Sequence, residues 1–319
     1  MKLGVSQSYL SMELPWVKFL LWALLLLVQI HKHIACIEDE RMGLLELKAF
    51  LKSKTNHTKP LLPTWVNDTK SECCSWEQVK CNTTTGYVIK LTLSSINQEQ
   101  NYENPWYINM SLFQPFKELR NLDLSDNKIA GWLVNEESNC LSKMSKLAHL
   151  NLSFNRFDKE ILRFLGALPV LKSLDLSYNF MEGPLSSHES NCLSKMSKLA
   201  HLNLSWNRFD KEILRFLGAL PVLKSLDLSY NSMEGPLSSH ELVNLNNLEV
   251  LILQENGLNG SLPFKDMANF SSLKILDLSE NSFTGSIPPY IGALSSLKAL
   301  SLYSNQLIGT LPSQGKNLL

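Results

Sequence analysis

The segment LKILDLSENSFTG, residues 273–285, decides the fold. In it Leu273, Leu276 and Leu278 precede Asn281 at fixed distances, and the same pattern, L-x-x-L-x-L-x-x-N-x-(L/I/F/M)-x-G, recurs along the chain. Its asparagines stand 24 to 28 residues apart at Asn127, Asn155, Asn179, Asn207, Asn231, Asn256, Asn281 and Asn305. A ninth, irregular repeat begins near Val88, with Ile96 in the asparagine position. Such a period indicates a stacked-repeat protein.

Each L-x-L piece predicts a short strand, with Leu276 and Leu278 facing inward and Asp277 outward. One strand cannot bury its apolar face alone, whereas strands stacked at about 4.8 Å form a parallel sheet over a continuous leucine core. The asparagine amide both donates and accepts, so a column of asparagines can satisfy the backbone at the turns. Amphipathic helices are excluded, because leucines spaced three and then two residues apart do not stay on one face of a helix. We therefore expect an α/β solenoid of about nine repeats over residues 87–319.

A cap is required before the first repeat, whose leucines are otherwise exposed. Residues 36–86 have that form. Leu44, Leu47 and Leu51 predict an amphipathic helix over residues 38–51. Trp65 and the string CCSWEQVKC, residues 73–81, follow. Four of the six cysteines lie in this region, which indicates a disulfide framework; a zinc site is the weaker alternative because there is neither a C-x-x-C pair nor a nearby histidine pair.

These motifs resemble plant-type leucine-rich-repeat proteins. The plant element Gly-x-(I/L)-Pro is kept at residues 285–288 and 309–312 and altered at residues 158–161, where the glycine is missing. The cap is similar to the pattern C-C-x-W-x-G-V-x-C, with Gln78 in place of the glycine. Segments such as SLDLSYNFMEGPLSSHE, residues 173–189, resemble receptor-like proteins, including the subgroup that contains the receptor sensing parasitic dodder.

The resemblance implies two disulfides, Cys36 with Cys73 and Cys74 with Cys81. It also implies an extracellular ligand-recognition module for immune or developmental sensing, without catalysis or cofactor. The implied ligand is a peptide, a microbial protein or a wall-derived elicitor, and the implied partner is a receptor kinase. A soluble protein similar to polygalacturonase inhibitors is the alternative, although those proteins end in a cysteine-containing cap that this sequence lacks. The balance of 30 basic against 30 acidic residues gives no sign of nucleic-acid binding.

Residues 1–35 predict a secretory signal, because Lys18 precedes the short apolar run FLLWALLLLV, residues 19–28. An uncleaved anchor and a start at Met12 are alternatives. No membrane span or C-terminal cap is predicted after it, so we expect a fragment or a truncated secreted product. The predicted location is secreted, or the outer side of the plasma membrane.

Eight N-x-S/T sequons predict glycans in the secretory pathway, at Asn56, Asn67, Asn82, Asn109, Asn151, Asn203, Asn259 and Asn269.

A second repetition lies over the first. Residues 138–189 recur as residues 190–241 and differ only at Phe154 against Trp206 and Phe180 against Ser232. The cause is tandem duplication or an artefact of sequence assembly. Its copies of one cysteine, Cys140 and Cys192, stand two repeats and about 10 Å apart, too far for direct pairing unless the loops lean together; free thiols or intermolecular pairing are the alternatives.

The position before each repeat asparagine carries the candidate site. Four consecutive repeats place aromatic residues there, which we expect along the border of the concave face, at Phe154, Tyr178, Trp206 and Tyr230. Exposed aromatic rows mark binding surfaces, although these rings can also simply shield the turns. The aspartates between strand leucines favour a solvated face over calcium binding, and His149 and His201 are expected to be exposed. We find no catalytic or metal-binding arrangement in the sequence.

Overall fold

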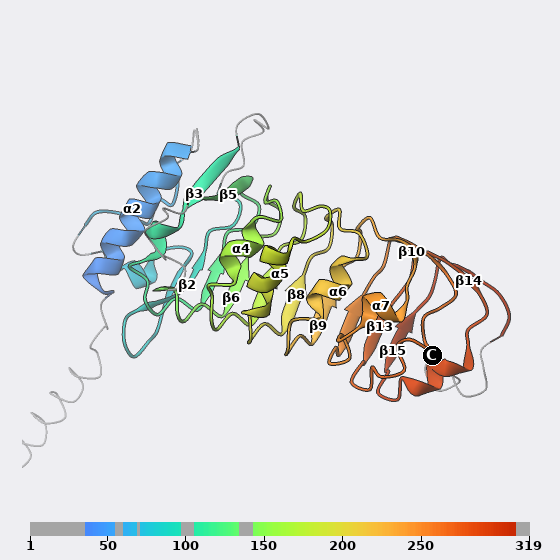
Figure 1. The fold of residues 1–319 in the computed structure, drawn as a ribbon. Coiled ribbons are helices and arrows are strands. Elements are labelled where there is room, and N and C mark those ends of the chain that lie inside the picture. Colours follow the sequence, from blue (N-terminus) through green and yellow to red (C-terminus); the bar gives the residue numbers. More distant parts are fainter. Residues whose placement is uncertain (1–35, 55–59, 69–70, 97–104, 134–142, 311–319) are drawn as a thin grey trace, which may run out of the picture. The chain divides into compact units, whose positions relative to one another are not determined.

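The computed structural model describes residues 36–54, 60–68, 71–96, 105–133 and 143–310, all within one compact unit, Cys36–Leu319. A ten-stranded sheet dominates it, and its strands follow one another in chain order in Figure 1. All neighbours pair in parallel except β1 with β2. The strands are β1 (Val79–Cys81), β2 (Val88–Thr92), β4 (Asn121–Asp123), β6 (His149–Asn151), β7 (Ser173–Asp175), β8 (His201–Asn203), β9 (Ser225–Asp227), β11 (Val250–Ile252), β13 (Ile275–Asp277) and β15 (Ala299–Ser301).

The register of this sheet aligns the central leucine of every repeat. Leu226 of β9 pairs with Leu202 of β8 and with Leu251 of β11, and Leu226 and Leu251 are fully buried. A one-residue slip turns the leucines to the outer face, so the register is fixed by the core. The predicted leucine solenoid is confirmed.

A second, four-stranded parallel sheet pairs the segments that follow the asparagines of the later repeats. It contains β10 (Glu234–Pro236), β12 (Gly257–Gly260), β14 (Ser282–Gly285) and β16 (Gln306–Leu307). Gly260 and Gly285, with φ of +77° and +78°, lie where the chain leaves these strands in a left-handed conformation. In the early repeats β3 (Trp106–Asn109) and β5 (Ile129–Leu133) form a separate parallel pair.

Helices occupy the middle repeats, and in two of these repeats the plant glycine is missing. The Asp158 side chain accepts a hydrogen bond of 3.0 Å from the Glu160 N–H, and the chain then enters a helix instead of a second-sheet strand. Asp210 repeats this arrangement in the second copy. The helices are α4 (Ile161–Leu165) and α6 (Ile213–Leu217) in the repeats without the glycine, and α5 (Ser187–Ser194) and α7 (Ser239–Leu242), which follow Gly183 and Gly235. The 3-10 turns η2 (Met110–Phe113) and η3 (Pro289–Ala293) belong to the first and the penultimate repeats.

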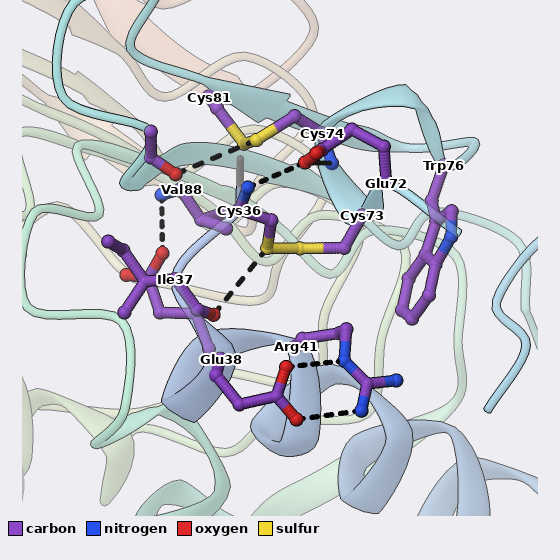
Figure 2. The surroundings of a disulfide bond; sticks show 12 residues. Cys36, Ile37, Glu38, Arg41, Glu72, Cys73, Cys74, Trp76, Cys81 and Val88 are labelled. Atoms are coloured by element: carbon purple, nitrogen blue, oxygen red, sulfur yellow. Dashed lines mark hydrogen bonds and ion pairs between the residues drawn. A yellow bond between two sulfur atoms is a disulfide. The ribbon is translucent and has the colours of Figure 1, made fainter. Parts of the chain in front are cut away.

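The N-terminal cap covers the first repeat with helix α2 (Glu38–Lys54), three residues longer than the predicted helix. Both predicted disulfides, Cys36–Cys73 and Cys74–Cys81, are formed, with Cα–Cα distances of 5.6 and 5.4 Å, beside the turn η1 (Cys73–Ser75) (Figure 2). The Glu72 carboxylate accepts the Cys36 N–H at 2.6 Å and so ties the start of the helix to this turn.

Two aromatic side chains complete the core of the cap. Trp65 and Trp76 stack at 5.9 Å and are buried. Among the described helices none combines the length and the apolar composition of a membrane span.

Candidate ligand-binding site

Each repeat asparagine binds the backbone of two neighbouring repeats. Asn207 donates from Nδ2 to three carbonyls, those of Leu176, Leu204 and Ser205, at 3.0 to 3.2 Å. Its Oδ1 accepts the Met181 N–H of the preceding repeat at 3.1 Å. The predicted double role of the amide is confirmed, and the column fixes the turn that carries the candidate aromatic residues.

The residue before each of these asparagines adopts a left-handed backbone. The φ angles are +53° at Phe154, +52° at Tyr178, +55° at Trp206 and +54° at Tyr230. Side chains avoid this region at a cost of roughly 1–2 kcal/mol per residue. It persists because the N–H of each of these residues donates to a carbonyl of the next repeat, for example from Tyr178 to Ser205 at 2.9 Å. These hydrogen bonds hold successive rings at the spacing of the sheet.

The four rings form one continuous stack. Phe154 lies 4.0 Å from Tyr178, Tyr178 lies 4.6 Å from Trp206, and Trp206 lies 4.0 Å from Tyr230, centroid to centroid. The interplanar angles are only 9° to 13°. Phe154, Tyr178 and Trp206 nevertheless keep 50, 36 and 42% of their surface exposed. Their faces contact one another, so the stack presents ring edges to solvent.

A groove of about 490 Å³ runs beside the stack. The residues that follow the asparagines also line it, and three of them are the cations Lys128, Arg156 and Arg208. Phe180 is the fourth, and its ring lies 5.9 Å from the Arg208 guanidinium. The groove therefore combines aromatic edges with positive charge.

Acidic residues continue the column beyond Tyr230. Glu255 and Glu280 share a hydrogen bond, which raises the pKa of Glu255. The Tyr303 hydroxyl donates to Glu280 at 2.7 Å and is the main cause that lowers the pKa of that carboxyl. Partial burial raises the pKa of the Tyr230 hydroxyl, and the two carboxylates add to the effect. From Phe154 onward, the residues before the asparagines thus change from aromatic to acidic along the solenoid.

The outer face of the main sheet is polar over its first strands. The aspartate side chains hold the turns: Asp175 accepts the Ser177 N–H at 2.9 Å and the Ser177 hydroxyl at 2.7 Å. Asn151 and Asn203 occupy the same position, half-buried, and each accepts only the N–H of the serine two residues on, which leaves Nδ2 for a glycan. His149 and His201 are exposed, as expected.

The remaining predicted site residues are spread over the surface. Asn67, Asn259 and Asn269 are exposed, whereas Asn82 and Asn109 are half-buried and accept backbone N–H groups in turns. Asn56 and Cys140 lie outside the described residues, as does the predicted signal, residues 1–35. Glycosylation and ligand contact stay predictions.

Cys192 is a buried free thiol. Over the described ranges, side chains able to hold a metal converge at the disulfide cysteines Cys36, Cys73 and Cys74, and at Glu212, His240 and Glu241. In the second group Glu241 already pairs with Lys211 at 3.3 Å.

The second row of the groove was not predicted from the sequence: Lys128, Arg156, Phe180 and Arg208. A signal for it exists, because each of these residues directly follows a repeat asparagine. Side chains before and after a buried residue at a turn point to the same rim, so the two columns together predict a groove.

Comparisons with known proteins identify the same cap and the same repeats as the structure. Residues 37–82 match the leucine rich repeat N-terminal domain, and residues 195–218 and 272–294 match leucine rich repeats. Receptor like protein 21 of Arabidopsis thaliana is 39% identical over 220 residues, 67% of this chain and 22% of that protein. The chain spans about a fifth of the length of such relatives, which also include Putative receptor-like protein 8 at 18%.

Two solved structures extend the match to the fold. The ectodomain of the Arabidopsis thaliana receptor kinase GASSHO1/SCHENGEN3, solved with CASPARIAN STRIP INTEGRITY FACTOR 2, superposes with a TM-score of 0.62 and 33% identity over 85% of this chain and 31% of that one. The Arabidopsis receptor kinase HAESA, in complex with the peptide hormone IDA and the co-receptor SERK1, gives 0.63 at 24% identity over 86% of this chain and 47% of that one, which shows the shared fold alone. By its cap, its repeats and these relatives, the chain belongs to the plant leucine-rich-repeat receptor-like protein family.

Proposed function

We propose that this chain is the ligand-recognition part of an extracellular receptor-like protein, that it binds a peptide in the groove beside the aromatic stack, and that it performs no chemistry itself. The observation that carries this proposal is the stack of four half-exposed rings on strained backbone. Each stacked pair contributes about 0.5–1.5 kcal/mol, which is of the same order as the cost of one left-handed residue. The stack is thus not a strong source of stability, and a role in binding accounts for its exposure better.

A peptide fits the groove better than a sugar. Sugars bind to aromatic residues through the ring faces, and here the inner faces are occupied by the neighbouring rings at 4.0 to 4.6 Å. An extended peptide can instead place side chains and carbonyls against ring edges. HAESA, which shares the fold, holds a peptide hormone together with a co-receptor. We therefore include a receptor kinase as the signalling partner and immune or developmental sensing as the role.

The test is a selection of peptides on the full chain produced in plant cells. Random peptides of about twelve residues are displayed and enriched for binding. At ~3.1 Å per residue such a peptide is longer than the row of four rings. Enriched peptides are then synthesised and their affinities measured for the wild type and for Tyr178→Ser/Trp206→Ser. We expect the double change to weaken binding by about tenfold or more, since buried aromatic contacts dominate such interfaces.

The matched control is Tyr107→Ser/Tyr290→Ser, which removes two tyrosines that are 45 and 52% exposed outside the groove. It should bind the enriched peptides as the wild type does. If no peptide is enriched, or if both double variants bind equally, the groove is not a peptide site and the proposal is wrong.

A further inference from the structure

The two copies of the duplicated unit diverge only at the groove. Residues 138–189 and 190–241 are identical apart from Phe154 against Trp206 and Phe180 against Ser232. The groove-lining positions of the first copy are few: Phe154, Asn155, Arg156, Tyr178, Asn179 and Phe180. Both differences fall among these positions, while every core, cap and loop position has stayed the same. The groove is therefore the part of the unit in which the copies have become different.

The repetition also gives the groove its internal symmetry. Each copy adds two repeats and keeps the register of the sheet, so β6 and β8 stand two strand spacings apart. Phe154, Arg156 and Tyr178 in the first copy correspond to Trp206, Arg208 and Tyr230 in the second. A single unit contains two rings, and the two units together make the four-ring stack. The groove is thus built from two half-sites, each with one arginine beside a pair of rings.

The half-sites are about 9 Å apart. Equivalent rings are separated by one spacing of 4.0 Å and one of 4.6 Å, and two strand spacings of about 4.8 Å give a similar distance for Arg156 and Arg208. A polyproline II peptide rises 3.1 Å per residue with three residues per turn, so residues i and i+3 lie on the same side about 9 Å apart. A β-strand brings i and i+2 to one side at only about 6.7 Å. The spacing of the half-sites matches the polyproline II repeat.

Charge selects the side chains of the ligand. Among the described residues that line the groove there are three cations, Lys128, Arg156 and Arg208, and one carboxylate, Asp126. That carboxylate already accepts a hydrogen bond of 2.7 Å from the Ser95 hydroxyl. Arg208 is 3.7 Å from Glu182, and both side chains are about two-thirds exposed at 63 and 67%. An exposed pair of this kind is worth at most about 1 kcal/mol, so an acidic ligand can replace Glu182.

We propose that the groove recognises an extended anionic peptide in the polyproline II conformation, with acidic side chains three residues apart that pair with Arg156 and Arg208. Bidentate arginine–carboxylate contacts supply the specificity, and the ring edges of the stack contact the turns of the peptide between them. This inference rests on the proposed function and names the ligand class of the same site.

The first test reads the composition of the enriched peptides from the selection described above. The expected pool contains Glu or Asp at i and i+3 with proline between them. Enriched peptides that are neutral or basic, or acidic without this spacing, overturn the inference while the proposed peptide site stands. A failure to enrich any peptide removes both.

The second test uses designed proline-rich peptides with two glutamates at i and i+3, at i and i+2, or replaced by glutamines. We expect the first peptide to bind about tenfold or more tightly than the other two. The i and i+2 peptide can place only one carboxylate on an arginine, and the glutamine peptide has no carboxylate to place. Arg156→Gln/Arg208→Gln should abolish this preference. The matched control is Arg163→Gln/Arg215→Gln, which removes the same charge from another pair of copied positions, on α4 and α6 outside the groove.

Three results contradict the proposal in this second test. One is equal affinity for the three peptides. Another is a control variant that loses the preference as fully as the groove variant, which assigns the effect to net charge. The third comes from a carbohydrate probe. An oligogalacturonate serves as the polyanion without a peptide backbone, and stronger binding of that probe than of the i and i+3 peptide makes the groove a wall-carbohydrate site instead.

Discussion

Each repeat asparagine bonds to four backbone groups, and neighbouring asparagines share some of the carbonyls: Leu204 O accepts from both Asn207 and Asn231. Asn231 donates to the carbonyls of Leu204, Leu228 and Ser229 at 3.0 to 3.2 Å and accepts the Phe209 N–H at 3.0 Å. We predict that Asn231→Ala lowers the free energy of unfolding by about 1–3 kcal/mol, because the Phe209 N–H loses its acceptor and the Leu204, Leu228 and Ser229 carbonyls each lose one of their donors.

Denaturant unfolding followed by circular dichroism measures this change. The control is Asn247→Ala, which removes one exposed hydrogen bond of 3.3 Å to the Pro221 carbonyl and should stay within about 0.5 kcal/mol of the wild type. Equal stability of the two variants contradicts the role given to the asparagine column.

A buried carboxyl in the cap makes stability depend on pH. Glu40 is 1% exposed, its Oε2 accepts the Val88 N–H at 2.7 Å, and its Oε1 is buried without a partner. Burial raises the pKa of this carboxyl to about 7, the Val88 hydrogen bond opposes the shift, and Glu118 and Lys117 exert smaller effects of opposite sign. Glu40 is therefore neutral at acidic pH in the folded protein.

Because the folded pKa lies above the ordinary value of 4.5, the stability contribution is complete below pH 4.5 and is lost as the pH rises through about 7. We expect the free energy of unfolding to fall by about 1–3 kcal/mol between these limits. Glu40→Gln should flatten this part of the profile. A variant whose stability falls with pH as steeply as that of the wild type assigns the effect to another group.

At the residue scale the role of the asparagines can be predicted from the sequence, because an amide repeated at the same turn position can bond to the backbone groups of that turn. It does not show the left-handed backbone before them. Phe, Tyr, Trp and Glu ordinarily avoid positive φ, so the positions that hold Phe154 and Glu280 carry no local signal for it. The parallel stacking of the rings follows from that conformation and was beyond reach for the same reason.

At the scale of elements, left-handed glycines stand at the ends of strands β12 and β14 of the second sheet. Gly285 ends β14 with φ of +78°, and an added Cβ meets no atom within 4 Å. We therefore predict that Gly285→Ala costs about 1 kcal/mol through its backbone conformation alone.

The comparison for this change is Gly292→Ala in the turn η3, where φ is not positive. There alanine restricts the unfolded chain and should be neutral or stabilising by up to about 1 kcal/mol. Thermal unfolding of both variants gives the two signs. Destabilisation of the same size at both positions means that the left-handed turn is not what requires glycine at position 285.

The elements were predicted unevenly. The strands and helix α2 have strong leucine periodicity and were found. Helices α4 and α6 were not predicted, because the altered plant element at residues 158–161 shows that a glycine is missing but does not by itself show that Asp158 accepts the Glu160 N–H in the turn before the helix. The interruption of the second sheet depends on neighbouring repeats and is visible only when they are stacked.

At the scale of the whole molecule, the recurrence of residues 138–189 as residues 190–241 sets the extent of the proposed ligand site. Two added repeats leave the leucine ladder in register, so the core tolerates them. The same addition doubles the rings of the stack and brings Arg156 and Arg208 into one groove. The aromatic half of this site was predicted from the sequence because repeats align equivalent positions; the groove was not, since it arises between two columns.

The proposed ligand lies along the aromatic stack, and photo-cross-linking can locate it. An enriched peptide that carries a diazirine is cross-linked to the full chain, which is then analysed by mass spectrometry. We expect cross-links within residues 126–128, 154–156, 178–180 and 206–208, and their loss in Tyr178→Ser/Trp206→Ser. Cross-links concentrated on the outer face of the main sheet or on the cap, unchanged in that variant, contradict this proposal.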